Sequence, residues 1–132
     1  MCESPWMSED RIHEWLGEEG LEKPRLYKLG FAHNNCGGFC IKAGEGPFAH
    51  FLRTFPERFA VHEAEEEAFN ASRPGRARQT VLAPQVEVSP GEFKRVPLSL
   101  KEFREKVEAG GQIDMFGGNG CGCFLDDPAE AA

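Results

Sequence analysis

Two glycine-rich cysteine pairs stand near opposite ends of this 132-residue chain. The first is Cys36-x3-Cys40, in the stretch HNNCGGFC, and the second is Cys121-x-Cys123, in NGCGCF. Glycine accepts backbone angles that other residues avoid, so it lets a loop curl around a metal ion and point N–H groups at sulfur. Together the two pairs supply four thiolates, which is the ligand number of a tetrahedral zinc site or a cubane iron–sulfur cluster.

Other uses of these thiols also fit the spacing. Neither C-x3-C nor C-x-C is the commonest metal-binding spacing, so a redox or nucleophilic role for one pair, or simple burial of inert thiols, stays open. Disulfides are the least expected use, because the acidic N-terminus MCESPWMSEDR does not resemble a signal peptide and intracellular thiols stay reduced. We expect Cys2 to be incidental, and His33 to hydrogen-bond to the loop rather than bind metal.

Composition excludes several classes of function. The net charge of −7 argues against nucleic-acid binding, which needs a basic stripe to meet the phosphates. The arginine-rich stretch SRPGRAR, residues 72–78, is expected to be a solvated loop. The sequence has no apolar run of about 18 residues, so no membrane-spanning helix is expected, and we expect a cytoplasmic protein. A hydrophobic content of 40% with eleven phenylalanines predicts a globular chain with a modest core.

The pattern along the chain predicts one mainly α-helical domain over residues 1–125, with irregular Gly/Cys-rich loops and a small β-hairpin. A disordered acidic tail is expected over 126–132. Helices are expected to begin after Ser8, at Pro47, at Pro56 and after the capping box Ser99-x-x-Glu102. Residues 80–88 and 93–98, joined by SPGE, have the pattern of two short strands. Pro24 predicts an extended approach to the glycine-rich loop at 34–47.

The predicted helices have apolar faces that are expected to be buried. In the first helix this face is Ile12, Trp15 and Leu16, spaced as one helical stripe. In the third, small residues are expected to pack closely while the glutamates on the Glu63–Glu67 side face water. The residues of that small-residue face are Ala60, Val61, Ala64 and Ala68.

Residues 4–44, SPWMSEDRIHEWLGEEGLEKPRLYKLGFAHNNCGGFCIKAG, contain a series of motifs in a characteristic order. This series resembles the C-terminal half of the phosphoadenosine phosphosulfate (PAPS) reductase family, in the adenine nucleotide α-hydrolase superfamily. The resemblance covers residues 5–71 well and 93–125 more loosely. The matching positions are Ser8, Asp10, Trp15, Pro24, Leu26, Tyr27, Gly30, Phe31, Asn34, Asn35, Cys36, Cys40, Lys42 and Gly44.

The resemblance implies the C-terminal portion of an α/β fold, since most strands of the family's parallel sheet belong to the other half. The family's nucleotide-binding loop, S-G-G-x-D-S, does not occur in this sequence. Such a loop presents backbone N–H groups to phosphates at a helix N-terminus. The resemblance therefore implies a half-enzyme that acts with a partner protein carrying the nucleotide-binding half.

The resemblance also assigns site residues. It implies a [4Fe–4S] cluster on Cys36, Cys40, Cys121 and Cys123, and it places Cys121, in a Cys-Gly motif, where the family has its nucleophile. Arg25 and Lys42 would steer an anionic phosphate or sulfate group. The family's glutamate before that cysteine and histidine after it are absent here, so sulfur transfer fits the two pairs better than sulfonate reduction.

Two alternatives do without catalysis. In one, the same four sulfurs close around zinc as the structural staple of an interaction module. In the other, the chain is a remnant whose thiols bind nothing.

Overall fold

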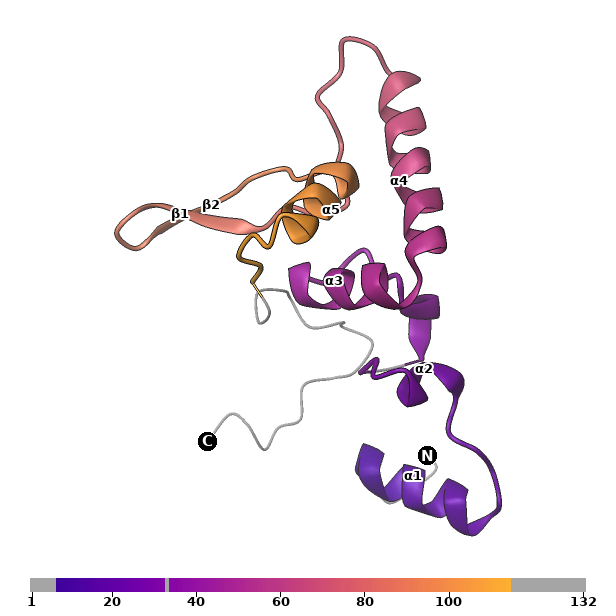
Figure 1. The fold of residues 1–132 in the computed structure, drawn as a ribbon. Helices are drawn as coiled ribbons and strands as arrows, with labels where there is room; N and C mark the ends of the chain where they lie inside the picture. The colour runs from indigo at the N-terminus through magenta and orange to yellow at the C-terminus, as the bar shows by residue number, and fades with distance from the viewer. Residues whose placement is uncertain (1–6, 33, 115–132) are drawn as a thin grey trace, which may run out of the picture.

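The computed structural model describes residues 7–32 and 34–114. In this part the chain is mainly helical, and its sheet is a two-stranded antiparallel hairpin, as predicted. In Figure 1, α3, α4 and α5 are grouped together, the hairpin projects from them, and α1 stands apart. The elements are α1 (Glu9–Glu18), α2 (Arg25–Lys28), the 3₁₀ turn η1 (Asn35–Gly38), α3 (Glu45–Thr54), α4 (Pro56–Ala71), β1 (Gln85–Ser89), β2 (Glu92–Arg95) and α5 (Leu100–Glu108).

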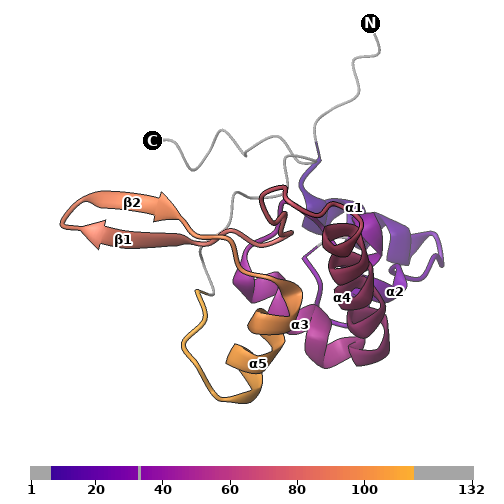
Figure 2. The same ribbon diagram turned by 90° about the horizontal axis from the view of Figure 1, so that it is seen from above.

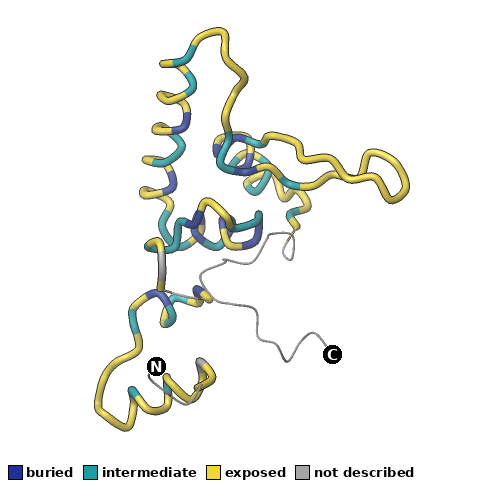
Figure 3. The backbone as a smooth tube through the Cα atoms, turned by 180° about the vertical axis from the view of Figure 1, so that it is seen from behind, coloured by how far each residue is buried: buried dark blue, intermediate teal, exposed yellow. Residues whose placement is uncertain are grey.

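The core lies where α3, α4 and α5 meet, and phenylalanine dominates it. The ring of Phe59 lies 6.4 Å from the ring of Phe51 and 6.4 Å from that of Phe103, which joins the three helices through one aromatic cluster. In Figure 3 the buried segments concentrate in these helices, while α1 and the hairpin are largely exposed. The buried apolar side chains are Leu26, Phe31, Phe48, Ala49, Phe51, Leu52, Phe59, Leu82, Leu100 and Phe103. None of the described helices is long and apolar enough to cross a membrane.

Two prolines mark the helices that carry this core. Pro56 is the first residue of α4, as predicted, where its missing N–H and fixed φ cost nothing. α3 begins at Glu45, two residues before the predicted start at Pro47. Pro47 is tolerated inside the first turn because the first four N–H groups of a helix lack intrahelical acceptors. The sequence predicts that this helix carries Phe48, Phe51, Leu52 and Phe55 on one side. The first three are buried in the structure, and Phe55, just past the helix end, is half-buried.

The predicted packing face of α4 is wrong. Phe59 and Glu66 are buried instead. The Glu66 carboxylate is accommodated because Oε1 accepts a 2.8 Å hydrogen bond from the N–H of Val81 and Oε2 accepts one of 2.8 Å from the N–H of Leu100. Leu100 opens α5, so the carboxylate also lies at the positive end of a helix dipole. The small-residue face that was expected to pack is exposed, and it consists of Ala60, Val61, Ala64 and Ala68.

A second glutamate of α4, Glu63, faces α5 rather than water. Arg104 donates from Nε and Nη2 to the two oxygens of Glu63, at 2.9 and 3.0 Å. This planar pair holds the pKa of Glu63 below its usual range, and it raises the pKa of Arg104. Carboxylates expected to face solvent therefore tie α4 to α5.

The expected burial of the α1 stripe is also wrong. Ser8 caps the helix as predicted, since its side chain accepts a 3.3 Å hydrogen bond from the N–H of Arg11. However, 39% of Ile12 and 46% of Trp15 are exposed, and Leu16 is only half-buried. The stripe stays open because α1 lies away from α3, α4 and α5 (Figure 1).

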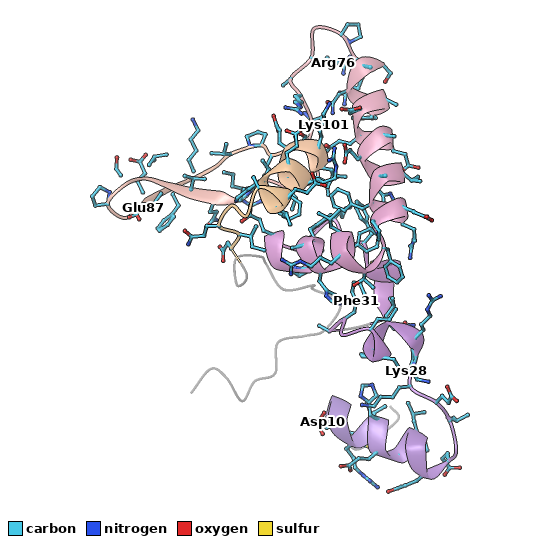
Figure 4. All side chains as sticks on the ribbon, viewed as in Figure 1. Asp10, Lys28, Phe31, Arg76, Glu87 and Lys101 are labelled. Atoms are coloured by element: carbon cyan, nitrogen blue, oxygen red, sulfur yellow. The ribbon has the colours of Figure 1, made fainter. Side chains whose placement is uncertain are left out.

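The segment after Pro24 is not extended as predicted but turns at once into α2. Pro24 itself is extended (φ −52°, ψ 146°), yet its ring restrains the residue before it and not the residues that follow. Leu26 then reaches the core, and Tyr27 meets His13 of α1 edge-on with 4.7 Å between ring centroids. Figure 4 places Lys28 at this junction, where its Nζ donates a hydrogen bond to Glu22 of the segment that joins α1 to α2.

The hairpin forms in the predicted region, with β1 and β2 shorter than the predicted segments 80–88 and 93–98. Val86 lies opposite Lys94, and Glu87 lies opposite Phe93, with Gly91 at φ +82° in the turn. Every residue of both strands is exposed, and Figure 2 shows the hairpin projecting from the helices.

The capping box of α5 is formed as predicted. The N–H of Ser99 donates to Glu102 over 2.9 Å, and the N–H of Glu102 donates back to Ser99 Oγ over 3.3 Å. Arg78 adds a 3.0 Å hydrogen bond to the same carboxylate. The Ser99 hydroxyl also donates to this carboxylate over 2.7 Å. The backbone and hydroxyl hydrogen bonds from Ser99, together with the bond from Arg78, lower the pKa of Glu102 to about 2.

Candidate functional site

The first cysteine pair lies on a tight left-handed turn between α2 and α3. Cys36, Gly37 and Gly38 have φ values of +55°, +59° and +87°, and the N–H of Phe39 closes the turn onto the carbonyl of Cys36 over 3.0 Å. A left-handed conformation costs a residue with a side chain about 1–2 kcal/mol, and glycine is nearly free of that cost. The glycine pair therefore allows the curled backbone that the sequence predicted, and Cys36 adopts it with them.

Close packing requires glycine at the end of this turn. A Cβ atom on Gly38 would lie 2.8 Å from Cε1 of Phe31, which is closer than real Cβ atoms approach other atoms, and 3.2 Å from Cδ2 of Phe51, which is tighter than most Cβ contacts. Both phenylalanines belong to the buried cluster. Figure 4 labels Phe31 next to α3, at the point where the chain enters the loop. The turn is thus pressed against the core.

The two thiols of the turn have different surroundings. Cys36 is exposed, whereas Cys40 is buried. Phe39, between them, stacks on the ring of His62 with 3.9 Å between centroids and meets the ring of Phe48 edge-on at 5.1 Å. Phe39 therefore anchors the turn to α3 and α4, and one thiol faces outward from that anchor.

Arg58, near the start of α4, contacts the turn directly. Its Nη1 donates a 3.2 Å hydrogen bond to the carbonyl of Gly37, and its guanidinium lies over the rings of Phe51 and Phe55 at 5.5 and 5.2 Å. Sequence reasoning missed Arg58. A single arginine in a charged helix carries no local signal, and only the docking of α4 against the loop brings it to Gly37.

The two cationic residues expected to bind an anion have different surroundings. Arg25 lies over the same Phe55 ring as Arg58, with its guanidinium carbon 5.9 Å from the centroid. Lys42 is exposed in the turn that follows Cys40. Arg25 and Arg58 thus bring two positive charges to one aromatic side chain beside the turn, an arrangement that favours anions.

A buried carboxylate connects this region to the end of the described chain. Glu45, the first residue of α3, is only 4% exposed. It accepts a 2.6 Å hydrogen bond from Lys106 Nζ and a 2.7 Å hydrogen bond from the N–H of Asp114. Asp114 is therefore held at Glu45, which follows Cys40 by five positions and begins the helix after the turn.

The remaining site predictions lie outside the described residues. These are the second pair, Cys121 and Cys123, together with Cys2, His33 and the tail 126–132. Within 7–32 and 34–114, no group of three or more His, Cys, Asp or Glu side chains is arranged to hold a metal ion. The described part thus contributes one cysteine pair to the predicted four-thiolate site, and convergence of the two pairs stays a prediction.

Comparisons of the chain with protein-family models, with curated proteins and with solved structures found no match.

Proposed function

We propose that this chain carries a four-cysteine metal centre, a [4Fe–4S] cluster bound by Cys36, Cys40, Cys121 and Cys123. The centre would serve a PAPS reductase-like or sulfur-transfer half-enzyme, built on the C-terminal portion of that family's α/β fold. A partner protein would bring the nucleotide-binding half. The family motifs in residues 4–44 support this assignment.

The observation that carries the proposal is the hydrogen bond between Asp114 and Glu45. Cys121 follows Asp114 by seven positions, and seven extended residues span at most about 25 Å. Because Asp114 is held at the start of α3, that reach includes the neighbourhood of the Cys36–Cys40 turn. An attachment at the hairpin tip would have made convergence of the two pairs much harder.

The chemistry of the donor set fits the proposed group. Four thiolates suit iron–sulfur clusters and zinc alike. A bound cluster would carry electrons or hold a sulfur atom for transfer to the activated acceptor. Arg25 and Lys42 would attract the anionic phosphate or sulfate group. The Cys-Gly motif makes Cys121 the candidate nucleophile when its sulfur is not bound to the metal centre.

The structural zinc site is the second candidate, and one observation favours it. Among the described residues, α1 and the hairpin contribute no buried side chain to the core. A closed four-thiolate zinc site contributes directly to the folding of small domains.

Anaerobic purification with metal analysis separates these candidates. A broad visible absorption band that dithionite bleaches, with iron and sulfide in the protein, would support the cluster. A colourless protein with one zinc ion per chain would support the structural zinc site. Protein that holds neither metal after anaerobic reconstitution with iron and sulfide or with zinc would refute both. Co-purification of a protein bearing an S-G-G-x-D-S loop would identify the partner half.

A shared site makes a further prediction about single cysteines. Cys40→Ser and Cys123→Ser should lower the metal content to the same degree, because each removes one of four ligands. Cys2→Ser serves as the control and should leave it unchanged. Full retention of metal in either of the first two variants would contradict a shared site.

A further inference from the structure

Arg58 contacts the cysteine turn from outside its own segment of chain. Its guanidinium lies on an aromatic surface formed by Phe51 and Phe55, and its Nη1 donates to the carbonyl of Gly37 over 3.2 Å. Its Nη2 lies 3.0 Å from the position that a Cβ atom on Gly37 would occupy. The planar group is therefore placed against the backbone that links Cys36 to Gly38.

This placement supports an unusual backbone. Three consecutive left-handed residues are uncommon, and Cys36 pays a conformational cost in that region. The hydrogen bond from Arg58 ties the middle of the turn to α4, while Phe39 ties its end to the core. Both contacts tie the turn to residues of α4, which lie outside the turn.

Among residues 7–32 and 34–114, no carboxylate forms an ion pair with the guanidinium of Arg58, and the same is true of Arg25 and Arg53. The chain as a whole carries a net charge of −7. A zinc ion or an oxidised [4Fe–4S] cluster with four thiolates adds two further negative charges. The Arg58 guanidinium, which contacts the turn directly, would offset part of that charge.

We propose that Arg58 is a positioning residue for the metal centre: it holds the turn at Cys36–Gly38 ready for metal and supplies positive charge beside the thiolates. The proposal rests on the proposed function, because the metal centre itself is part of that function. It assigns a role to a residue outside the four ligands.

The first test is metal affinity in the full chain, metal-depleted and reduced, with Co²⁺ and Zn²⁺ as probes. Arg58→Gln should weaken binding by about 10- to 100-fold, the usual effect of losing a partner outside the ligand set. The metal affinity of Arg58→Lys should lie between that of Arg58→Gln and that of the unchanged protein, because lysine keeps the charge but not the planar contact. Equal affinity of Arg58→Gln and the unchanged chain would overturn the proposal.

Arg53→Gln is the matched control for this titration. Arg53 is an exposed arginine of the neighbouring helix α3, and no contact of its side chain with the cysteine turn is seen among the described residues. The variant removes the same charge and should keep the affinity within about twofold. Circular dichroism melts of all variants establish that a weaker affinity does not come from unfolding.

A second test works without metal and so separates the two proposals. Iodoacetate is negatively charged and iodoacetamide is neutral, and both alkylate the thiolate form of a cysteine. The rate with iodoacetate divided by the rate with iodoacetamide at Cys36, measured by peptide mass spectrometry, is therefore independent of the fraction of thiol that is ionised and reports the local charge. Arg58→Gln should lower this ratio about two- to threefold, while Arg58→Lys and Arg53→Gln should hold it. Amide hydrogen exchange at Phe39 should also speed up in Arg58→Gln.

The outcomes are distinguishable. Failure of the unchanged chain to bind any metal would refute the proposed function, and the alkylation ratio and amide exchange would still decide the role of Arg58. If metal binds but neither affinity, ratio nor exchange changes in Arg58→Gln, the positioning role is refuted and the metal centre stands.

Discussion

Replacing Gly38 by alanine would place a methyl group against two buried aromatic rings. The backbone at Gly38 has φ +87°, and a side chain in the left-handed region costs about 1–2 kcal/mol. The new Cβ would also lie 2.8 Å from Phe31 and 3.2 Å from Phe51. Neither ring moves aside easily within a packed cluster, so overpacking adds about 1–3 kcal/mol. We expect Gly38→Ala to lower the free energy of unfolding by about 2–5 kcal/mol.

Gly75→Ala isolates the conformational part of this loss. Gly75 has a similar φ of +77°, but a Cβ atom there would meet nothing within 4 Å. Its cost should therefore be the left-handed penalty alone, about 1–2 kcal/mol. The restriction that alanine imposes on the unfolded chain is the same in both variants and cancels in the comparison.

Urea unfolding followed by circular dichroism measures both variants under one condition, with linear extrapolation of the free energy. Equal losses in Gly38→Ala and Gly75→Ala would refute the argument that the turn is pressed against the core. Phe31→Leu provides a double-mutant cycle. If the ring is the obstacle, Gly38→Ala should cost less in the Phe31→Leu background than in the unchanged chain.

Two further predictions concern the glutamates that join the helices. Glu66→Gln should lower the free energy of unfolding by about 2–4 kcal/mol, because the amide keeps one acceptor oxygen and turns an N–H group toward the N–H of Val81 or Leu100. A loss below about 0.5 kcal/mol in urea unfolding would contradict the buried role of this carboxylate. Glu102 has its pKa lowered to about 2 from 4.5, so its ionised form stabilises the fold above about pH 4.5, and this contribution is lost as the pH falls toward 2. Glu102→Gln removes that titration, so the difference in free energy of unfolding between the unchanged chain and the variant should be smaller at pH 3 than at pH 6. A difference that does not change with pH would contradict the lowered pKa of Glu102.

Much of the local structure could be predicted because its causes lie within a few residues. Ser8 and Ser99 cap the helices that they were expected to cap, and Pro56 opens α4. The SPGE turn joins the two strands. Caps, prolines and turns act through hydrogen bonds and φ restrictions that reach three or four positions, so the order of residues is sufficient.

Which face each helix buries could not be predicted in the same way. On α4 the small residues suggested a packing face, yet Glu63 and Glu66 face the protein instead. Their charges are tolerated only because Arg104 and the N–H groups of Val81 and Leu100 approach from segments far along the chain. Hydrophobic periodicity depends only on which residues are apolar, so it gives no information about hydrogen-bond donors from distant segments.

The same distinction holds for the cysteine site, where the shape of the loop could be predicted and its contacts with the rest of the chain could not. The letters CGGFC were enough to predict a curled, glycine-dependent loop, because left-handed φ values are a property of glycine itself. The contact of Arg58 with Gly37 and the hydrogen bond that holds Asp114 at Glu45 depend on how α4 and the residues after α5 dock against α3. Such contacts join positions more than twenty and nearly seventy residues apart. Only packing in three dimensions selects them, since no short-range force relates the residues involved.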